Sequence, residues 1–158
     1  MHIKRCFFIG HRRAPQELRP MLKVEVERHI AEYGVTEFIV GHYGDFDRMA
    51  ADAVIDAKEK YPHISLLMLL PYHPTERIIK IPEGFDGTYY PEGMEKVPRS
   101  LAIVRANRCM TDRSDYLIAY AYKPGGNARE LVEYARKRER RGLMVICNLA
   151  DDIQSRRA

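Results

Sequence analysis

The stretch Gly41-His42-Tyr43-Gly44-Asp45 combines residue types that could bind a phosphate group. It follows the apolar run 38–40, and from Asp45 onward apolar residues recur at helical spacing. A strand that ends in Gly-x-x-Gly at the start of a helix exposes backbone N–H groups beside the positive end of that helix, which attracts anions. Asp45 would cap the helix or accept a sugar hydroxyl. The alternative is a tight strand-to-helix turn with a capping aspartate and no ligand.

Two further glycine-containing turns follow other predicted strands. One lies at residues 10–12, after the first strand, and the other at residues 125–127, before a predicted helix. Glycines allow backbone to approach a ligand closely, and Arg12 and Asn127 could hold a phosphate. Asn107, from a further predicted helix, is an additional candidate contact. The candidate ligand-binding residues are Gly10, His11, Arg12, Gly41, Gly44, Asp45, Asn107, Gly125, Gly126 and Asn127.

Alternating strands and helices are expected to position these turns. The strands are predicted at residues 5–9, 38–40, 63–70, 116–120 and 143–147, and the helices at 20–33, 45–61, 99–111 and 128–141. This order indicates an α/β, Rossmann-like three-layer fold, with a mainly parallel sheet of about five strands and helices on both faces. In such a sheet, ligands bind outside the carboxyl ends of the strands. The turns therefore predict one small-molecule pocket at that edge.

The chain of 158 residues is expected to form a single domain over residues 1–150. The polar tail 151–158 is predicted to fray. Residues 72–98, which include four prolines, form a predicted long loop. Its aromatic residues favour an ordered flap at the mouth of the pocket, and the alternative is an insertion packed on the sheet edge.

Composition narrows the class of protein. The net charge of +4 is mild, and the three cysteines form no C-x-x-C pair, which favours a reducing, cytoplasmic setting. No apolar run is long enough to cross a membrane, and we expect no membrane association. The basic run 136–141 lies at the end of a predicted helix without aromatic neighbours, so it is interpreted as a solvated helix end and not as a nucleic-acid patch.

Metal and cofactor chemistry find little support in the sequence. His11, His42 and His73 each follow a predicted strand and could converge on a metal with Asp45, but none has a second His or Cys two to four residues away, so no metal site is predicted. No cofactor is expected either. Among the carboxylates that could assist hydrolysis, Glu130 is the best placed, because it lies in the first helical turn after Gly125 and Gly126.

Several segments in this order resemble the SLOG superfamily. They are residues 6–12, 38–47, 110–119 and 124–126, and the resemblance covers about residues 4–150. The superfamily includes the DNA-uptake protein DprA, the cytokinin-activating LOG hydrolases and the small YpsA-like group, to which the chain is most similar. The resemblance implies a Rossmann-like fold, a pocket for a nucleotide-derived phosphorylated ligand, and a homodimer.

LOG hydrolases cleave the N-glycosidic bond of nucleoside monophosphates with an arginine and a glutamate in two motifs. Residues 110–113 resemble the first motif and make Arg113 a candidate catalytic residue. Residues 124–126 match the start of the second motif, but Val132 stands where the glutamate is expected. Glu130 is then the candidate substitute for that glutamate.

We therefore expect the chain to bind or sense a nucleotide-derived phosphorylated ligand at the carboxyl ends of the strands. LOG-like nucleotide N-glycosidic hydrolysis is the alternative, and DprA-like DNA binding is the second alternative. The sequence leaves open whether the protein is an enzyme. It favours a nucleotide-like small molecule over a nucleic acid as the partner.

Overall fold

A single parallel sheet organises the chain. The computed structural model describes residues 2–157, and the side chains of residues 2–153. Within this part, six strands pair in the order β4-β3-β2-β1-β5-β6, and every pairing is parallel. The strands are β1 (Arg5–Gly10), β2 (Glu37–Val40), β3 (Ser65–Leu69), β4 (Gly87–Tyr89), β5 (Tyr116–Tyr120) and β6 (Val145–Asn148).

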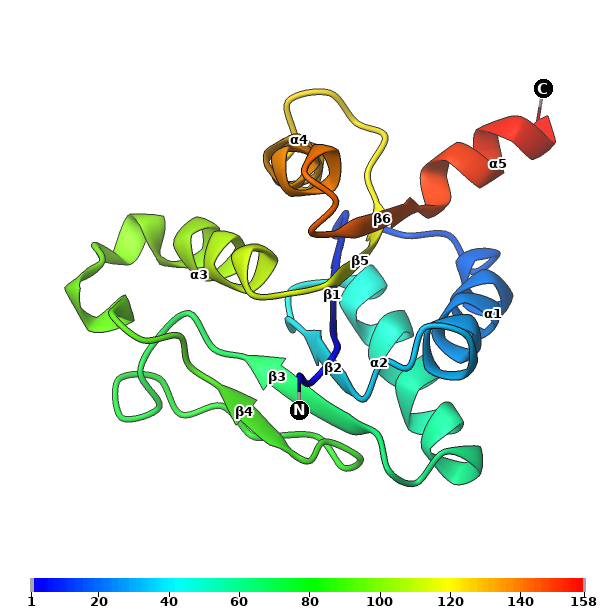
Figure 1. Cartoon of the computed structure of the whole chain (residues 1–158). Coiled ribbons are helices and arrows are strands. Elements are labelled where there is room, and N and C mark those ends of the chain that lie inside the picture. Colours follow the sequence, from blue (N-terminus) through cyan, green and yellow to red (C-terminus); the bar gives the residue numbers. More distant parts are fainter. Residues whose placement is uncertain (1, 158) are drawn as a thin grey trace.

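Helices cover both faces of this sheet (Figure 1). One face carries α1 (Leu18–Ala31), α2 (Asp45–Lys60) and α5 (Leu149–Arg157), and the other carries α3 (Ala102–Asp112) and α4 (Asn127–Arg140). Two short 3₁₀ turns, η1 (Met94–Lys96) and η2 (Arg99–Leu101), precede α3. The predicted α/β three-layer fold is confirmed.

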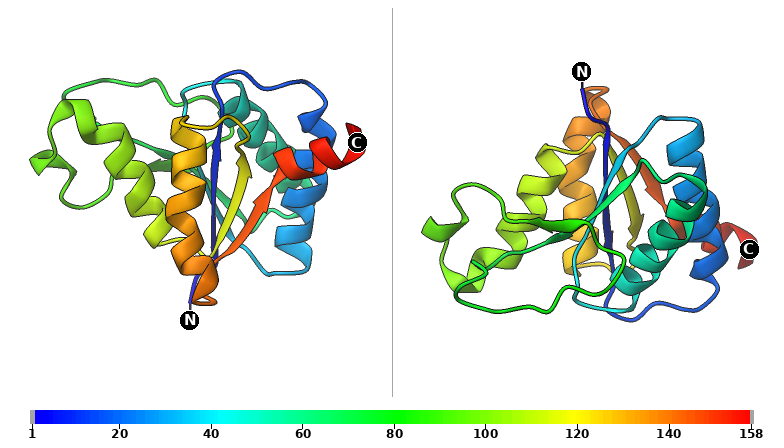
Figure 2. Two further views of the ribbon diagram at one scale, coloured as in Figure 1. Left: turned by 90° about the horizontal axis from the view of Figure 1, so that it is seen from above. Right: turned by 90° about the horizontal axis from the view of Figure 1, so that it is seen from below.

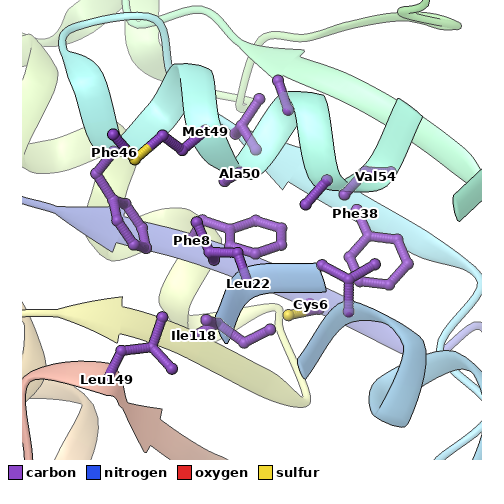
Figure 3. Close-up of a cluster of buried hydrophobic side chains, with 14 of the residues drawn as sticks. Cys6, Phe8, Leu22, Phe38, Phe46, Met49, Ala50, Val54, Ile118 and Leu149 are labelled. Carbon is purple, nitrogen blue, oxygen red and sulfur yellow. The ribbon is translucent and has the colours of Figure 1, made fainter. Parts of the chain in front are cut away.

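Strand β1 lies between β2 and β5 and supplies side chains to both halves of the core. Cys6 and Phe8 pack toward α1 and α2, whereas Phe7 packs toward α3 and α4, as the alternation of side chains along a strand requires. The rings of Phe8 and Phe38 stack with centroids 6.0 Å apart (Figure 3). Because β1 is buried on both faces, its carboxyl end cannot shift without disturbing the core.

The predicted loop 72–98 contains a strand. Its residues Gly87–Tyr89 form β4, which pairs with β3 at the sheet edge, so the sheet has six strands where about five were expected. The Asp86 carboxylate secures the entry to β4 by accepting the Leu66 N–H at 2.8 Å. This arrangement agrees with the alternative of an insertion packed on the sheet edge.

The C-terminal residues are helical up to Arg157, where the sequence led us to expect a frayed tail over residues 151–158, of which Ala158 lies outside the described residues. Helix α5 runs over Leu149–Arg157, and Leu149, Ala150 and Ile153 are buried against the core that contains α1. The apolar residues at positions 149 and 153 lie one helical turn apart, which is the spacing that buries one face of a helix. Within residues 2–157, no helix has the length and apolar character that crossing a membrane requires.

Candidate functional site

A cavity of about 520 Å³ opens at the carboxyl edge of the sheet, around the end of β1. The strand order changes direction there, because β2 lies on one side of β1 and β5 on the other. Crevices of this kind are where open α/β sheets bind ligands. Figure 2 shows the loops that follow β1, β2 and β5 from two sides. The lining residues are Phe7, Phe8, Ile9, Gly10, His11, Arg12, Arg13, Gly41, Tyr43, Gly44, Asp47, Leu69, Pro71, Ile103, Ala106, Asn107, Tyr122, Lys123, Gly126, Asn127 and Ala128.

The turns after β1 and β2 are interlocked. The Asp45 N–H donates to the Arg12 carbonyl oxygen at 2.8 Å. A Cβ atom added at Gly44 would lie 2.7 Å from the Arg12 Cα, and one added at Gly10 would overlap the Phe46 ring. Gly44 therefore allows the two backbones to approach each other closely, and Gly10 leaves room for the Phe46 ring.

Asp47, rather than Asp45, is the carboxylate of α2 that lines the cavity. Its Oδ2 accepts the Tyr43 backbone N–H at 3.1 Å, and burial raises the pKa of Asp47 to about 6. The exposed Asp45 carboxylate instead accepts the Ala14 N–H at 3.4 Å. Asp47, which the sequence did not single out, therefore occupies the place in the cavity wall that was expected of Asp45. The sequence position of Asp47 could have indicated its bond to Tyr43, because a side chain at the third position of a helix can reach back to the backbone that precedes the helix.

His11 joins the end of β1 to the loop between β5 and α4. Its Nε2 accepts two backbone N–H groups, from Tyr122 at 3.0 Å and from Lys123 at 3.2 Å. An imidazole nitrogen that accepts hydrogen bonds is unprotonated, so the proton of the neutral ring is on Nδ1. Burial, and secondarily the charge of Lys123, lowers the pKa of His11. His11 therefore shapes the cavity wall as well as lining it.

The N-terminus of α4 forms the part of the cavity best suited to an anion. Gly126, Asn127 and Ala128 all line the cavity there, and the first N–H groups of a helix lack partners within it. Lys123 adds a positive charge beside them. The first turn of α2, in contrast, carries two carboxylates, Asp45 and Asp47. The lining would therefore accommodate an anion better at α4 than at the α2 turn that the sequence emphasised.

Eight of the ten predicted ligand-binding residues line the cavity: Gly10, His11, Arg12, Gly41, Gly44, Asn107, Gly126 and Asn127. Asp45 and Gly125 do not. Gly125 has a φ of 76°, so it serves the turn that leads into α4.

Neither candidate catalytic residue lines the cavity. Arg113 is the C-cap of α3, and its carbonyl oxygen accepts a hydrogen bond from Arg5, which begins β1, at 3.2 Å. It therefore lies at the amino edge of the sheet, opposite the cavity. Glu130 is exposed on α4, and Val132 is fully buried in the core. The described residues also contain no group of three or more His, Cys, Asp or Glu side chains that could hold a metal ion.

The fold and cavity define a parallel α/β protein with a ligand-sized crevice at the switch point of its sheet. No protein-family model matches the sequence, and no curated protein does. The structure is similar to DNA processing protein A (DprA) from Streptococcus pneumoniae, with a TM-score of 0.64 and 12% identity over 91% of this chain and 49% of that one. It is also similar to DprA from Helicobacter pylori, which is described in a single-stranded DNA binding mode, with a TM-score of 0.52 and 15% identity over 96% of this chain and 79% of that one.

These similarities show a DprA-like Rossmann-type fold, in agreement with the superfamily resemblance. The chain spans about half the length of the Streptococcus pneumoniae protein, 49%. The closer resemblance to the YpsA-like group stays a prediction.

Proposed function

We propose that the chain binds a phosphorylated, nucleotide-like small molecule in the switch-point cavity. The observation that carries the proposal is the lining itself, which brings Arg12, Arg13 and Lys123 together with the N-terminus of α4 in about 520 Å³. That volume lies in the range of small-molecule sites, which is about 300–1,000 Å³.

The phosphate would bind at the first turn of α4, where the N–H groups of Asn127 and Ala128 have no partner within the helix and lie beside Lys123. The Gly126 N–H is already bonded to the Lys123 carbonyl oxygen, at 3.3 Å. Arg12 would contact the phosphate from the opposite turn, because a guanidinium can hold phosphate oxygens bidentately. Ile9 and Ile103 supply apolar surface in the same cavity, against which a sugar or base could pack.

Binding is a better proposal than LOG-type hydrolysis. That reaction needs a carboxylate at the glycosidic bond, and the corresponding position is occupied by the buried Val132. The exposed Glu130 lies outside the cavity lining. We therefore expect a bound nucleotide to be recovered intact.

Single-stranded DNA binding is the second candidate. The Helicobacter pylori DprA, described in such a binding mode, has a similar structure over 96% of the length of the present chain. Arg12, Arg13 and Lys123 would then contact the phosphates of a strand. Such binding would weaken steeply as salt increases, whereas occupation of the cavity by one nucleotide would depend on salt much less.

A thermal-shift screen with nucleotides tests the proposal, with chromatography of each hit for breakdown products. A ligand at 100 times its dissociation constant adds about 2.7 kcal/mol of stability, which corresponds to about 5–10 °C for a chain of this length. Lys123→Ala should abolish the shift, whereas Lys137→Ala, at an exposed site on α4 outside the cavity, should preserve it. Salt-sensitive retardation of a DNA strand without any nucleotide shift would favour the second candidate.

A further inference from the structure

One carboxylate faces the anion-binding cavity. Among the lining residues, which all belong to the described part of the chain, three are cationic and only Asp47 is acidic. A carboxylate opposes the binding of a phosphate placed against it. Its presence in the lining therefore indicates that the ligand also brings hydrogen-bond donors.

The two oxygens of Asp47 have different surroundings. Oδ2 accepts the Tyr43 N–H at 3.1 Å and lies against Gly41, where an added Cβ would approach it to 2.9 Å. Oδ1 has no hydrogen-bond partner within the residues that the structure describes. The Tyr43 bond fixes the carboxylate in place, so the unpaired Oδ1 is a preset acceptor in a cavity wall.

The donors must belong to the same molecule as the phosphate. In a nucleoside 5′-phosphate, the 2′- and 3′-hydroxyls are neighbouring donors, separated from the phosphate by the sugar ring. The cavity offers the matching arrangement, because the anion-binding groups at Asn127 and Ala128 belong to α4 while Asp47 belongs to α2. Acidic side chains bind ribose hydroxyls in this way in other nucleotide-binding α/β folds.

We propose that Asp47 accepts hydrogen bonds from the ribose hydroxyl pair, so that the cavity selects ribonucleotides over their 2′-deoxy counterparts. This inference rests on the proposed function and specifies its substrate class. It separates the cavity from a site for DNA, whose sugars lack the 2′-hydroxyl.

Asparagine at position 47 separates hydroxyl recognition from a structural role. Its amide oxygen can still accept the Tyr43 N–H, but its NH₂ group then faces the cavity as a donor and not as an acceptor. Asp47→Asn therefore preserves the turn and removes the acceptor. Asp45→Asn is the matched control, because Asp45 lies two residues away, is exposed and does not line the cavity.

The experiment is calorimetric titration at pH 8 with the four ribonucleoside 5′-monophosphates and their four 2′-deoxy counterparts. We expect at least one ribonucleotide to bind the wild-type chain about tenfold more tightly than its deoxy partner, since a hydrogen bond to a charged group is worth about that factor. Asp47→Asn should bring the ratio of the two affinities near one, because it weakens ribonucleotide binding more than deoxynucleotide binding, and Asp45→Asn should keep the wild-type ratio.

If the wild-type chain binds ribonucleotides and deoxynucleotides with equal affinity, the inference is overturned, whereas the proposed nucleotide binding still holds. A ratio unchanged in a folded Asp47→Asn variant would overturn it equally. Absence of binding by all eight nucleotides would instead remove the proposed function, and the inference with it. The wild-type ratio decides the question even where the variant fails to fold.

Discussion

The Nε2 atom of His11 lies 3.0 Å from the backbone nitrogen of Tyr122 and accepts its hydrogen. The two residues are 111 positions apart in the chain, yet this bond connects the turn after β1 directly to the loop that leads into α4. Since both turns line the cavity, the shape of the proposed anion subsite depends on the imidazole being present and neutral.

Replacement of His11 by alanine should loosen the loop before α4. Two backbone N–H groups lose their acceptor, which should lower the free energy of unfolding by about 1–3 kcal/mol. Urea denaturation measures the loss. His73→Ala is the control, because His73 is exposed and its side-chain hydrogen bonds are confined to Thr75, and it should change stability little.

The stabilising effect of His11 should depend on pH. Its pKa is lowered from 6.5 in the folded chain, so the unfolded chain binds the proton more readily. The contribution is complete above pH 6.5 and is lost as pH falls through the lower folded-state pKa. Unfolding free energies measured between pH 8 and pH 5 should therefore converge for wild type and His11→Ala. A constant difference across this range would contradict the role assigned to the neutral ring.

Asp47 should have the opposite effect on stability. Its pKa is raised from 3.8 to about 6 by burial, so the folded chain binds this proton more tightly and its stability falls as pH rises from about 4 to above 6. We expect Asp47→Asn to be more stable than wild type at pH 8 by up to about 3 kcal/mol, since one pKa unit is worth about 1.4 kcal/mol, with the advantage lost below pH 4. Thermal unfolding at several pH values tests this, and a variant destabilised at pH 8 would refute it.

Gly44→Ala should destabilise the chain by about 1–3 kcal/mol, because the added Cβ would lie 2.7 Å from the Arg12 Cα, a backbone atom that cannot rotate away. Gly87→Ala is the matched control. Its Cβ would contact only the Leu67 side chain, at 3.5 Å, so we expect little change in the denaturation midpoint.

Restoring a glutamate at position 132 should not create a hydrolase. Val132 is 0% exposed, so Val132→Glu would bury a carboxylate without a partner and cost about 3 kcal/mol or more. Lys137→Glu on the exposed face of the same helix should be tolerated. Release of free base from a nucleotide by a stably folded Val132→Glu protein would show that this position does reach the cavity.

Apolar runs and helical spacing predicted the central elements because burial imposes these patterns directly. The run at residues 38–40 became part of β2, and the periodicity after Asp45 became α2. Strand β4 has only three residues, Gly87–Tyr89, and it exists through its pairing with β3. No local pattern specifies such a strand.

The cavity was predicted from its turns because glycine and strand ends are local signals. The sequence could not show which carboxylate faces inward. Residues 45 and 47 differ by about 200° around a helix axis, and only the packing of α2 on the sheet decides between them. Arg113 was assigned by resemblance, and the orientation of α3 places it at the other edge of the sheet. Glu130 was chosen for its place in the first turn of the predicted helix, and it is exposed outside the cavity lining.

Apart from Leu69 and Pro71, the cavity wall comes from two stretches distant in the chain, one over residues 7–47 and the other over residues 103–128. A molecule bound between them would act as a noncovalent crosslink. The helices α3 and α4 could then detach from the rest of the sheet only after the molecule dissociates. Amide hydrogen exchange in these two helices should slow in proportion to occupancy, even at positions the molecule never touches.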